Sequence, residues 1–439
     1  MISIKSLKKL GLLGSLYVSQ FMPFWFLYQA LPVFMRQKGL SLEAIGSLSS
    51  LALPITLRFL WSPLIDRYGF TRWGHYRFWI ICFQLLVAST TVVCAWLNVE
   101  GNFTALLIAM ALMCLFSASQ DIATDALAVG LLEPKERGLG NAVQSVGGSL
   151  GGAIGGGGML ILLSNWGWRN SLLTLALIMI VTLIPVLLHR EKVVSADLTR
   201  DVVNDLSMSF TDNSSTTSAT KSVTKQSSDS PVFISYFKTL IKFCRLPGMG
   251  YWLLILLLYS ASSSMAPTMF RPLLVDIGLS LSDIGWLLGI VGTIANMFGG
   301  IVAGLLIAPL GRKRSLIVFS SLWTLSMMIY LLPAFGVTNL PVLYLVACAA
   351  FLTIGMMTTA TFTIMMDKST LESPGTDYTV QSSVGLLGSI GAAAISGVIA
   401  GAIGYRGVFA LSGAIAIISV LLIVKLFRST ERAVTSRDA

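Results

Sequence analysis

Three ionisable residues stand out because they lie inside long apolar runs of the sequence. Arg58 lies in a run that ends near residue 65, and Asp121 and Asp125 lie in a run that ends near residue 131. A charge in the hydrocarbon core of a membrane costs about 3 kcal/mol or more, so such residues are functional candidates by default. A buried carboxyl can exchange a proton, and a buried guanidinium can hold an anionic solute.

The spacing of these residues predicts their arrangement. Asp121 and Asp125 are four positions apart and share one helix face. Arg58 lies eight positions before Asp66, and Asp125 lies eight positions before Glu133. Because a helix rises about 1.5 Å per residue, this places them at similar depth, and we predict an Arg58–Asp125 pair. Asp121 is then without a partner and is the first candidate for a proton carrier, since burial disfavours its charged form. A structural ion pair that locks two helices is an equally open alternative.

The elements that must position these residues are apolar runs long enough to cross a bilayer. The chain of 439 residues is 55% hydrophobic and 11% charged, with a mean hydropathy of +0.80. A soluble domain has about a quarter of its residues charged, and a membrane helix needs roughly 20 apolar residues. Twelve such runs occur, at 10–34, 42–65, 78–98, 104–131, 139–163, 170–188, 249–272, 281–308, 315–334, 340–366, 377–401 and 406–426. We therefore predict an all-α integral membrane protein with 12 transmembrane helices.

The basic residues predict its orientation. The formal net charge is +10, and the Lys and Arg residues lie mainly in short segments between apolar runs. That is the pattern of topogenic charge, and it argues against nucleic-acid binding. With a cytoplasmic N-terminus, the opposite side holds only Arg36, Lys38, Arg169, Arg271 and Arg406. Because cytoplasmic loops carry the excess of Lys and Arg, we predict that both termini are cytoplasmic.

Short matches relate the first half of the chain to the second. Segment 39–48 recurs at 278–287, Val143-Gln144-Ser145 recurs as Val380-Gln381-Ser382, and Gly167-Trp168-Arg169 recurs as Gly404-Tyr405-Arg406. Because six helices separate the copies, both have the same membrane orientation. We predict two parallel six-helix repeats, 1–189 and 247–439, joined by a cytoplasmic linker at 190–246. The Ser/Thr-rich part of this linker is expected to be flexible, and 232–243 is either an interfacial helix or a plain lead-in to the seventh membrane helix.

The loop after the second predicted helix, at 62–69, contains Asp66, Arg67 and Gly69. An acidic residue followed by a basic residue and a glycine resembles the signature loop of the major facilitator superfamily. The resemblance implies that this loop braces the two halves in one conformation, because a carboxylate at a helix end can take a partner across the interface. The alternative is a solvated loop that carries topogenic charge.

The fifth predicted helix is rich in glycine, at 147–148, 151–152 and 155–158. Glycines four positions apart let a neighbouring backbone approach closely, so we expect tight packing that still permits sliding. A phosphate-binding loop is the alternative, but it needs a preceding strand and a following Lys-Ser/Thr pair. The sequence here has neither feature.

Other polar and aromatic residues in the apolar runs are candidates for the lining of a solute cavity. They are Gln20, Gln29, Gln120, Gln144, Ser260 and Gln381, with Trp25, Tyr28 and Tyr259 as surfaces on which a ring can stack. For each of these residues taken singly, helix packing is the simpler explanation.

The stretch 119–141 carries a more specific resemblance. Its Gln-Asp-Ile-Ala-Thr-Asp run at 120–125, then Glu136-Arg137-Gly138 and the glycine run, are similar to the branch of the superfamily that holds muropeptide permeases and acetyl-CoA transporters. Within that branch, the chain resembles most closely the siderophore importers of the rhizobactin and pyochelin type. The resemblance implies a protein of the bacterial inner membrane that imports a ferric siderophore or related chelate with proton coupling. A muropeptide permease, or an exporter, is the alternative.

Other classes of function match poorly. The chain has two histidines, His75 and His189, and five scattered cysteines without a Cys-x-x-Cys pair. We therefore expect no enzyme, no catalytic residues, no metal site and no cofactor. The expected partners are a small-molecule solute, the lipid bilayer and protons, and we expect a monomer.

Overall fold

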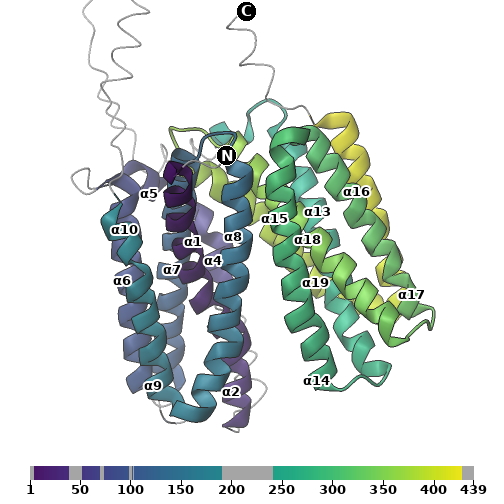
Figure 1. Cartoon of the computed structure of the whole chain (residues 1–439), viewed down its shortest axis with the longest axis horizontal. Helices are drawn as coiled ribbons and strands as arrows, with labels where there is room; N and C mark the ends of the chain where they lie inside the picture. The colour runs from purple at the N-terminus through teal and green to yellow at the C-terminus, as the bar shows by residue number, and fades with distance from the viewer. Residues whose placement is uncertain are drawn as a thin grey trace, which may run out of the picture.

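The architecture is that of two helical bundles side by side, seen in a computed structural model (Figure 1). The structure describes residues 4–38, 52–69, 74–97, 101, 103–189 and 241–427. The Ser/Thr-rich part of the linker, most of the 232–243 segment and the first copy of the 39–48 repeat lie outside these residues. Every regular element in the described part of the chain is helical.

The first bundle contains the elements up to residue 188. They are α1 (Ile4–Trp25), η1 (Phe26–Ala30) and α2 (Leu31–Gln37); α4 (Ala52–Leu57), η3 (Arg58–Leu60) and α5 (Ser62–Arg67); α6 (His75–Trp96); α7 (Phe103–Leu131); and α8 (Arg137–Gly152), η5 (Ala153–Gly158), α9 (Met159–Thr182) and α10 (Ile184–Leu188). We call this bundle the N half.

The second bundle, the C half, contains the elements after the linker. They are α13 (Met249–Asp276); α14 (Leu281–Ile284), η6 (Gly285–Val291) and α15 (Gly292–Leu310); α16 (Arg312–Ile329) and α17 (Leu331–Ala334); α18 (Leu340–Lys368); and α19 (Pro374–Leu426). The elements η1, η5 and η6 are π-helical, and η3 is a 3₁₀ turn.

The described residues hold nine helices that are long and apolar enough to cross a membrane. Two of them, at 137–188 and 374–426, each contain two spans because the chain turns at Gly167 and Gly404. The remaining span, second in chain order, is described as two short α-helices, α4 and α5, with the 3₁₀ turn η3 between them. The prediction of an all-α membrane protein with 12 spans is therefore confirmed.

The two turns repeat each other in detail. Gly167 has φ 70° and ψ 177°, and Gly404 has φ 69° and ψ 176°. Positive φ is strained for residues with a Cβ, which explains why both copies of the repeat keep glycine here. The guanidinium of Arg169 lies 4.8 Å from the ring centre of Trp96, and that of Arg406 lies 4.8 Å from the ring centre of Phe335. The sequence match at these turns thus corresponds to a structural match.

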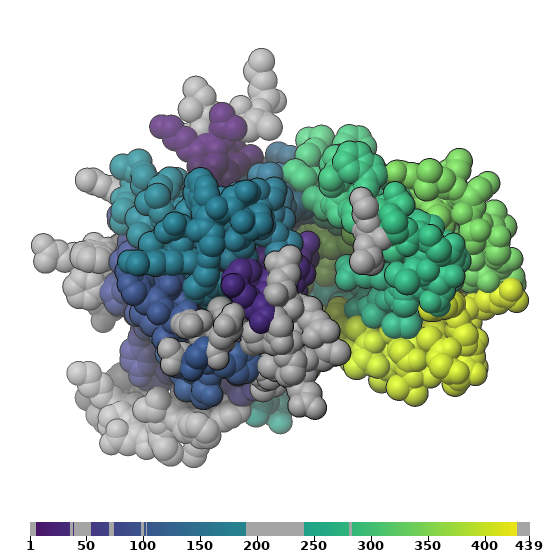
Figure 2. Space-filling view, turned by 90° about the horizontal axis from the view of Figure 1, so that it is seen from below, coloured from purple at the N-terminus to yellow at the C-terminus, as the bar shows by residue number. Residues whose placement is uncertain are grey.

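The bundles meet on one side of the membrane. Helix α1 begins and α19 ends on the same side, which we call the terminal side; the opposite side is the far side (Figure 1). Helix α8 packs against α15 and α18, and α19 packs against α5 and α7. A Cβ on Gly138 of α8 would lie 2.9 Å from the carbonyl oxygen of Gly304 in α15, so these helices touch backbone to backbone. Seen from the far side, the surface is hollowed between the halves (Figure 2).

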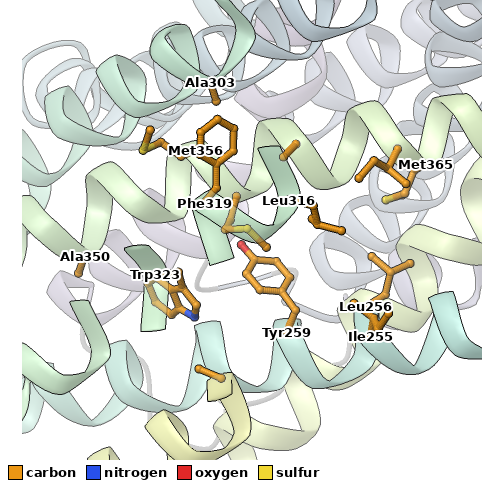
Figure 3. Close-up of a cluster of buried hydrophobic side chains, with 14 of the residues drawn as sticks. Ile255, Leu256, Tyr259, Ala303, Leu316, Phe319, Trp323, Ala350, Met356 and Met365 are labelled. Carbon is orange, nitrogen blue, oxygen red and sulfur yellow. The ribbon is translucent and has the colours of Figure 1, made fainter. Parts of the chain in front are cut away.

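Large apolar side chains fill the centre of the C half. Phe319 and Trp323 of α16 are 0% and 1% exposed and pack with Met356 of α18 and Ala303 of α15 (Figure 3). Tyr259 of α13 closes the same cluster on the side toward α19, and it is 7% exposed. This core holds α13, α15, α16 and α18 together as one body.

Glycines hold α8 and η5 against α1, as the spacing of the glycines predicts. A Cβ on Gly151 would lie 2.7 Å from Cβ of Phe21 and 2.9 Å from the carbonyl oxygen of Val18. A Cβ on Gly155 would collide with the carbonyl group of Met22. Gly157, two positions further along the chain, has open space where its Cβ would be.

We predict that Gly155→Ala destabilises the protein and that Gly157→Ala does not. The first substitution forces η5 away from α1, and overpacking of this kind costs about 1–3 kcal/mol. Thermal unfolding in detergent, monitored by size-exclusion chromatography, should show a lower midpoint temperature for Gly155→Ala. Equal midpoints for the two variants would show that α1 and η5 do not pack as closely as the structure indicates.

Candidate functional site

Arg58 lies at the point where the second span is interrupted. The 3₁₀ turn η3 begins at this residue, between α4 and α5, and the residue is only 8% exposed. Its Nη1 forms an ion pair with Oδ2 of Asp121 in α7. The charge that the sequence places inside the membrane is therefore neutralised by a carboxylate of the same half.

The direct ion pair of Arg58 is with Asp121 rather than with Asp125 as predicted, so Asp121 does not lack a partner; Asp125 is still close enough for its charge to attract that of Arg58. Asp125 is 2% exposed and instead accepts a hydrogen bond of 3.4 Å from Oη of Tyr17 in α1. The depth argument assumes a continuous α-helix, but the second span changes to a 3₁₀ turn at Arg58. A 3₁₀ turn rises about 2.0 Å per residue and alters the direction of the side chain, so Arg58 reaches the neighbouring carboxylate on α7.

These residues border a cavity of about 370 Å³ between the two halves. This is within the usual range for small-molecule sites, about 300–1,000 Å³. The N half contributes the charged groups of Arg58, Asp121 and Asp125 to the lining. The C half contributes hydroxyl groups, from Tyr259, Ser260, Ser263, Thr358, Thr361, Tyr378, Ser382 and Ser389. The described residues include no group of three His, Cys, Asp or Glu side chains that could hold a metal ion.

Five of the predicted cavity residues line this space. They are Gln20, Gln144, Tyr259, Ser260 and Gln381. Gln381 is fully buried, and its amide is already engaged: Oε1 accepts a bond of 2.7 Å from Trp252, and Nε2 donates to the carbonyl oxygens of Met365 and Asp377. Gln381 thus ties helices of the C half together in this conformation.

The other four predicted residues lie outside the cavity lining. Gln120 points into the N half, where its Nε2 donates a bond of 3.1 Å to Gln84 of α6. Trp25 packs over Gly152, Tyr28 lies 4.6 Å from the ring centre of Phe24, and Gln29 is exposed beside Gly156. Trp25, Tyr28 and Gln29 lie on α1 and η1, closer to the far side than the cavity is.

Several functional candidates were not singled out by the sequence. Tyr17 and Tyr378 are both fully buried, Tyr17 binds Asp125, and Tyr378 lines the cavity. Ser382 accepts a hydrogen bond of 2.7 Å from Nη2 of Arg58. Ser382 could have been found, since it ends one of the repeated triplets. Tyr17 and Tyr378 lack any such signal, because a tyrosine in an apolar run is also an ordinary packing residue.

Asp66 connects the halves at the terminal side. Its carboxylate accepts backbone hydrogen bonds of 3.0 Å from Gly375 and 2.6 Å from Thr376, in the first turn of α19. It also accepts a bond of 3.0 Å from Oη of Tyr76. The free N–H groups and the dipole of a helix N-terminus favour a carboxylate in this position. This contact joins the N half to the C half at the terminal side.

A second contact across the halves involves Asp367 at the end of α18. The carboxylate pairs with Arg137 of α8 at 2.8 Å and with Arg312 of α16 at 2.5 Å. Arg312 also donates to the carbonyl oxygen of Pro134 in the N half. We call the Asp66 and Asp367 contacts the terminal-side latches.

The other two residues of the predicted gating loop play lesser parts. Arg67 is exposed and lies 5.8 Å from the ring centre of Tyr68, and no ion pair of Arg67 occurs within the described ranges. A Cβ on Gly69 would collide with the ring of His75, so a larger residue at this position would force that ring to move.

Comparison with known proteins supports a transporter. The family model of the Major Facilitator Superfamily matches residues 13–391 and 251–438. The anhydromuropeptide permease of Escherichia coli K12 is 26% identical over 413 residues, 91% of this chain and 76% of that protein. An uncharacterised protein of Haemophilus influenzae is 26% identical over 396 residues, 88% of this chain and 86% of its own length.

Solved structures show the same fold at low identity. A bacterial homologue of the iron transporter ferroportin in its outward-facing state has a TM-score of 0.66 at 14% identity, covering 95% of this chain and 98% of its own. The proton:xylose symporter XylE has a TM-score of 0.68 at 12% identity, covering 97% and 96%.

We predict that Asp66→Asn weakens closure of the terminal side and that Arg67→Gln does not. The asparagine loses the charge that favours the N-terminus of α19 and presents an NH₂ group where only acceptors fit. Spin labels at Leu188 and Lys425, both exposed at the terminal side, should show an added longer distance in Asp66→Asn. An unchanged distance distribution would mean that the Asp367 contact alone keeps the halves closed.

Proposed function

Because the chain belongs to the Major Facilitator Superfamily and is a membrane transporter, we propose that it imports an anhydromuropeptide-type solute with proton coupling. The observation that carries the proposal is the ionisable cluster of Arg58, Asp121 and Asp125 in a cavity between two halves. At the terminal side, the halves are joined by the Asp66 and Asp367 contacts. This arrangement corresponds to one state of an alternating-access cycle, in which the site is open toward the far side.

The lining of the cavity supports this class of solute. A muropeptide combines sugar hydroxyl and amide groups with peptide carboxylates. The hydroxyl groups of the C half suit the first set, and Arg58 of the N half suits the second. The similarity to the permease of Escherichia coli extends over nearly the whole chain. The siderophore substrate that the sequence favours has no support among the relatives described above, so the muropeptide, first given as an alternative, becomes the main proposal.

We place the protein in the bacterial inner membrane, with the terminal side toward the cytoplasm. The positive charge of the terminal-side segments supports this orientation. For proton coupling, Asp125 is a better candidate than Asp121, because Asp121 already neutralises Arg58. Asp125 is buried, accepts a hydrogen bond from Tyr17 and forms no direct ion pair in the described part of the chain, although its charge is attracted by that of Arg58.

We expect gene-dependent uptake of a radiolabelled 1,6-anhydromuropeptide into cells, and we expect a protonophore to abolish it. Ferric siderophore, tested in the same cells, should show no gene-dependent uptake. The opposite result for the two solutes would restore the siderophore importer and reject the muropeptide permease.

We also predict that Asp125→Asn abolishes proton-driven accumulation and preserves solute exchange. The neutral side chain keeps the volume and the contact with Tyr17 but cannot release a proton. Accumulation and counterflow in proteoliposomes separate the two activities. Asp121→Asn, the matched variant one helical turn away, should impair both, because it leaves the buried charge of Arg58 without its partner. Normal accumulation by Asp125→Asn would remove this residue from the coupling mechanism.

A further inference from the structure

We propose that Arg58 binds a carboxylate of the solute through its Nε–Nη2 edge, and that this binding breaks the hydrogen bond from Arg58 to Ser382 and thereby loosens the contact between the halves. The identity of the solute rests on the proposed function, but the contact with Ser382 does not. The inference assigns a ligand-sensing role to Ser382, which ends one of the repeated triplets.

One edge of the Arg58 guanidinium, formed by Nε and Nη2, faces no carboxylate among the described residues. Nη1 is occupied by Asp121, and Nη2 donates to Ser382 at 2.7 Å. Nε is buried, and it has no hydrogen-bond partner among the described residues. Nε and Nη2 point the same way along one edge of the guanidinium and together form the fork that a carboxylate binds with two parallel hydrogen bonds. A ligand carboxylate therefore gains two charge-assisted bonds and displaces one neutral hydroxyl.

Ser382 is directly affected when a ligand carboxylate replaces it on Arg58. Its hydroxyl accepts from Arg58 of the N half and donates to the carbonyl oxygen of Thr379 within α19. Both Arg58 and Ser382 line the cavity, so a ligand can reach the contact from the far side. When the ligand takes the guanidinium edge, Ser382 loses its partner in the other half.

The same two segments are joined a second time at the terminal side. Arg58 binds Ser382, and eight positions after Arg58 the carboxylate of Asp66 binds the amides of Gly375 and Thr376. The second span and α19 are thus fastened at two heights, one in the cavity and one at the latch. Breaking the Arg58–Ser382 contact removes one of these two links, which couples occupancy of the cavity to opening of the terminal side.

The repeat supplies a matched control for this contact. Ser145 ends the triplet in α8 that corresponds to the triplet ending in Ser382. It also faces the other half, but its neighbour there is Gly300 of α15: a Cβ on Gly300 would lie 2.8 Å from Oγ of Ser145. The contact of α8 with α15 is therefore made by small residues, whereas that of α19 with the second span includes a charged hydrogen bond. Only the second can respond to an anion.

The test measures opening of the terminal side by alkylation of one buried cysteine. Thr363 of α18 is fully buried against α8, where it accepts a bond of 3.3 Å from Asn141, so Thr363→Cys reacts with a maleimide only when the halves separate. All five native cysteines are replaced by alanine in this background: Cys82, Cys94, Cys114, Cys244 and Cys348. The cysteine introduced at position 363 is then the one reactive thiol, and Thr363→Cys in that background is the parent for all comparisons. The probes are 1,6-anhydro-N-acetylmuramyl tripeptide with free carboxylates and the same compound with every carboxylate amidated.

Without a probe, Ser382→Ala should react roughly tenfold faster than the parent, because a hydrogen bond to a charged group is lost. Ser145→Ala should react at the parent rate, and Ser382→Thr, which keeps the hydroxyl, should do the same. The acid probe should accelerate the parent and add little to Ser382→Ala, and the amide probe should accelerate neither.

Two results would overturn the inference. One is an equal rate for Ser382→Ala, Ser145→Ala and the parent. The other is equal acceleration of the parent by acid and amide probes. The Ser382→Ala measurement uses no ligand, so it separates this inference from the proposed function. If Ser382→Ala reacts faster than the parent but cells do not accumulate muropeptide, the inference about the Arg58–Ser382 contact stands and the muropeptide substrate is rejected. If Ser382→Ala reacts at the parent rate and the protein transports muropeptide, the inference is rejected and the muropeptide substrate stands.

Discussion

The charge of Arg58 in the middle of the membrane is the constraint on which the site depends. A cation at this depth must have a partner, and Asp121 supplies one from α7. The pair fixes the second span against α7 and so turns Asp125 of the same helix face toward the cavity and Tyr17. Because another nitrogen of the guanidinium reaches Ser382, the same charge also contacts the C half. One side chain therefore links the interior of one bundle to its interface with the other.

Two kinds of contact surround this charge, and they have different consequences for movement. Glycines bring α8 against α1, within the N half, and against α15 of the C half at backbone distance. The latches at Asp66 and Asp367 are directional and exist only when donors and acceptors are aligned. We expect the small-residue contacts to tolerate movement of the halves, whereas the hydrogen bonds and ion pairs must break for the terminal side to open.

The sequence was sufficient to predict the fold and the residues around the site, but it did not predict which side chains pair with one another. Apolar runs and repeats follow from hydropathy and from short matches such as Gly167 and Gly404, where backbone geometry demands glycine. The depth of Arg58 was right, but its partner was wrong, since spacing along a chain does not reveal a 3₁₀ turn within a span. Gln120 was misplaced for a related reason: polarity marks it as buried and bonded without saying which side of α7 it occupies.

The repeat also explains why charge lies on one wall of the cavity and hydroxyls on the other. At the offsets of 237 to 239 that relate the two halves, the counterparts of Asp121 fall at 358–360 and those of Asp125 at 362–364, and none of these positions is charged. Thr358 and Phe362, within these ranges, line the same cavity. A duplicated scaffold must keep the residues that turn and pack its helices, whereas a second set of buried charges would need a second set of partners. Among the described residues, the carboxylates and the guanidinium that line the cavity all belong to the N half, and the C half meets this charged cluster through groups such as Ser382, which accepts a hydrogen bond from Arg58.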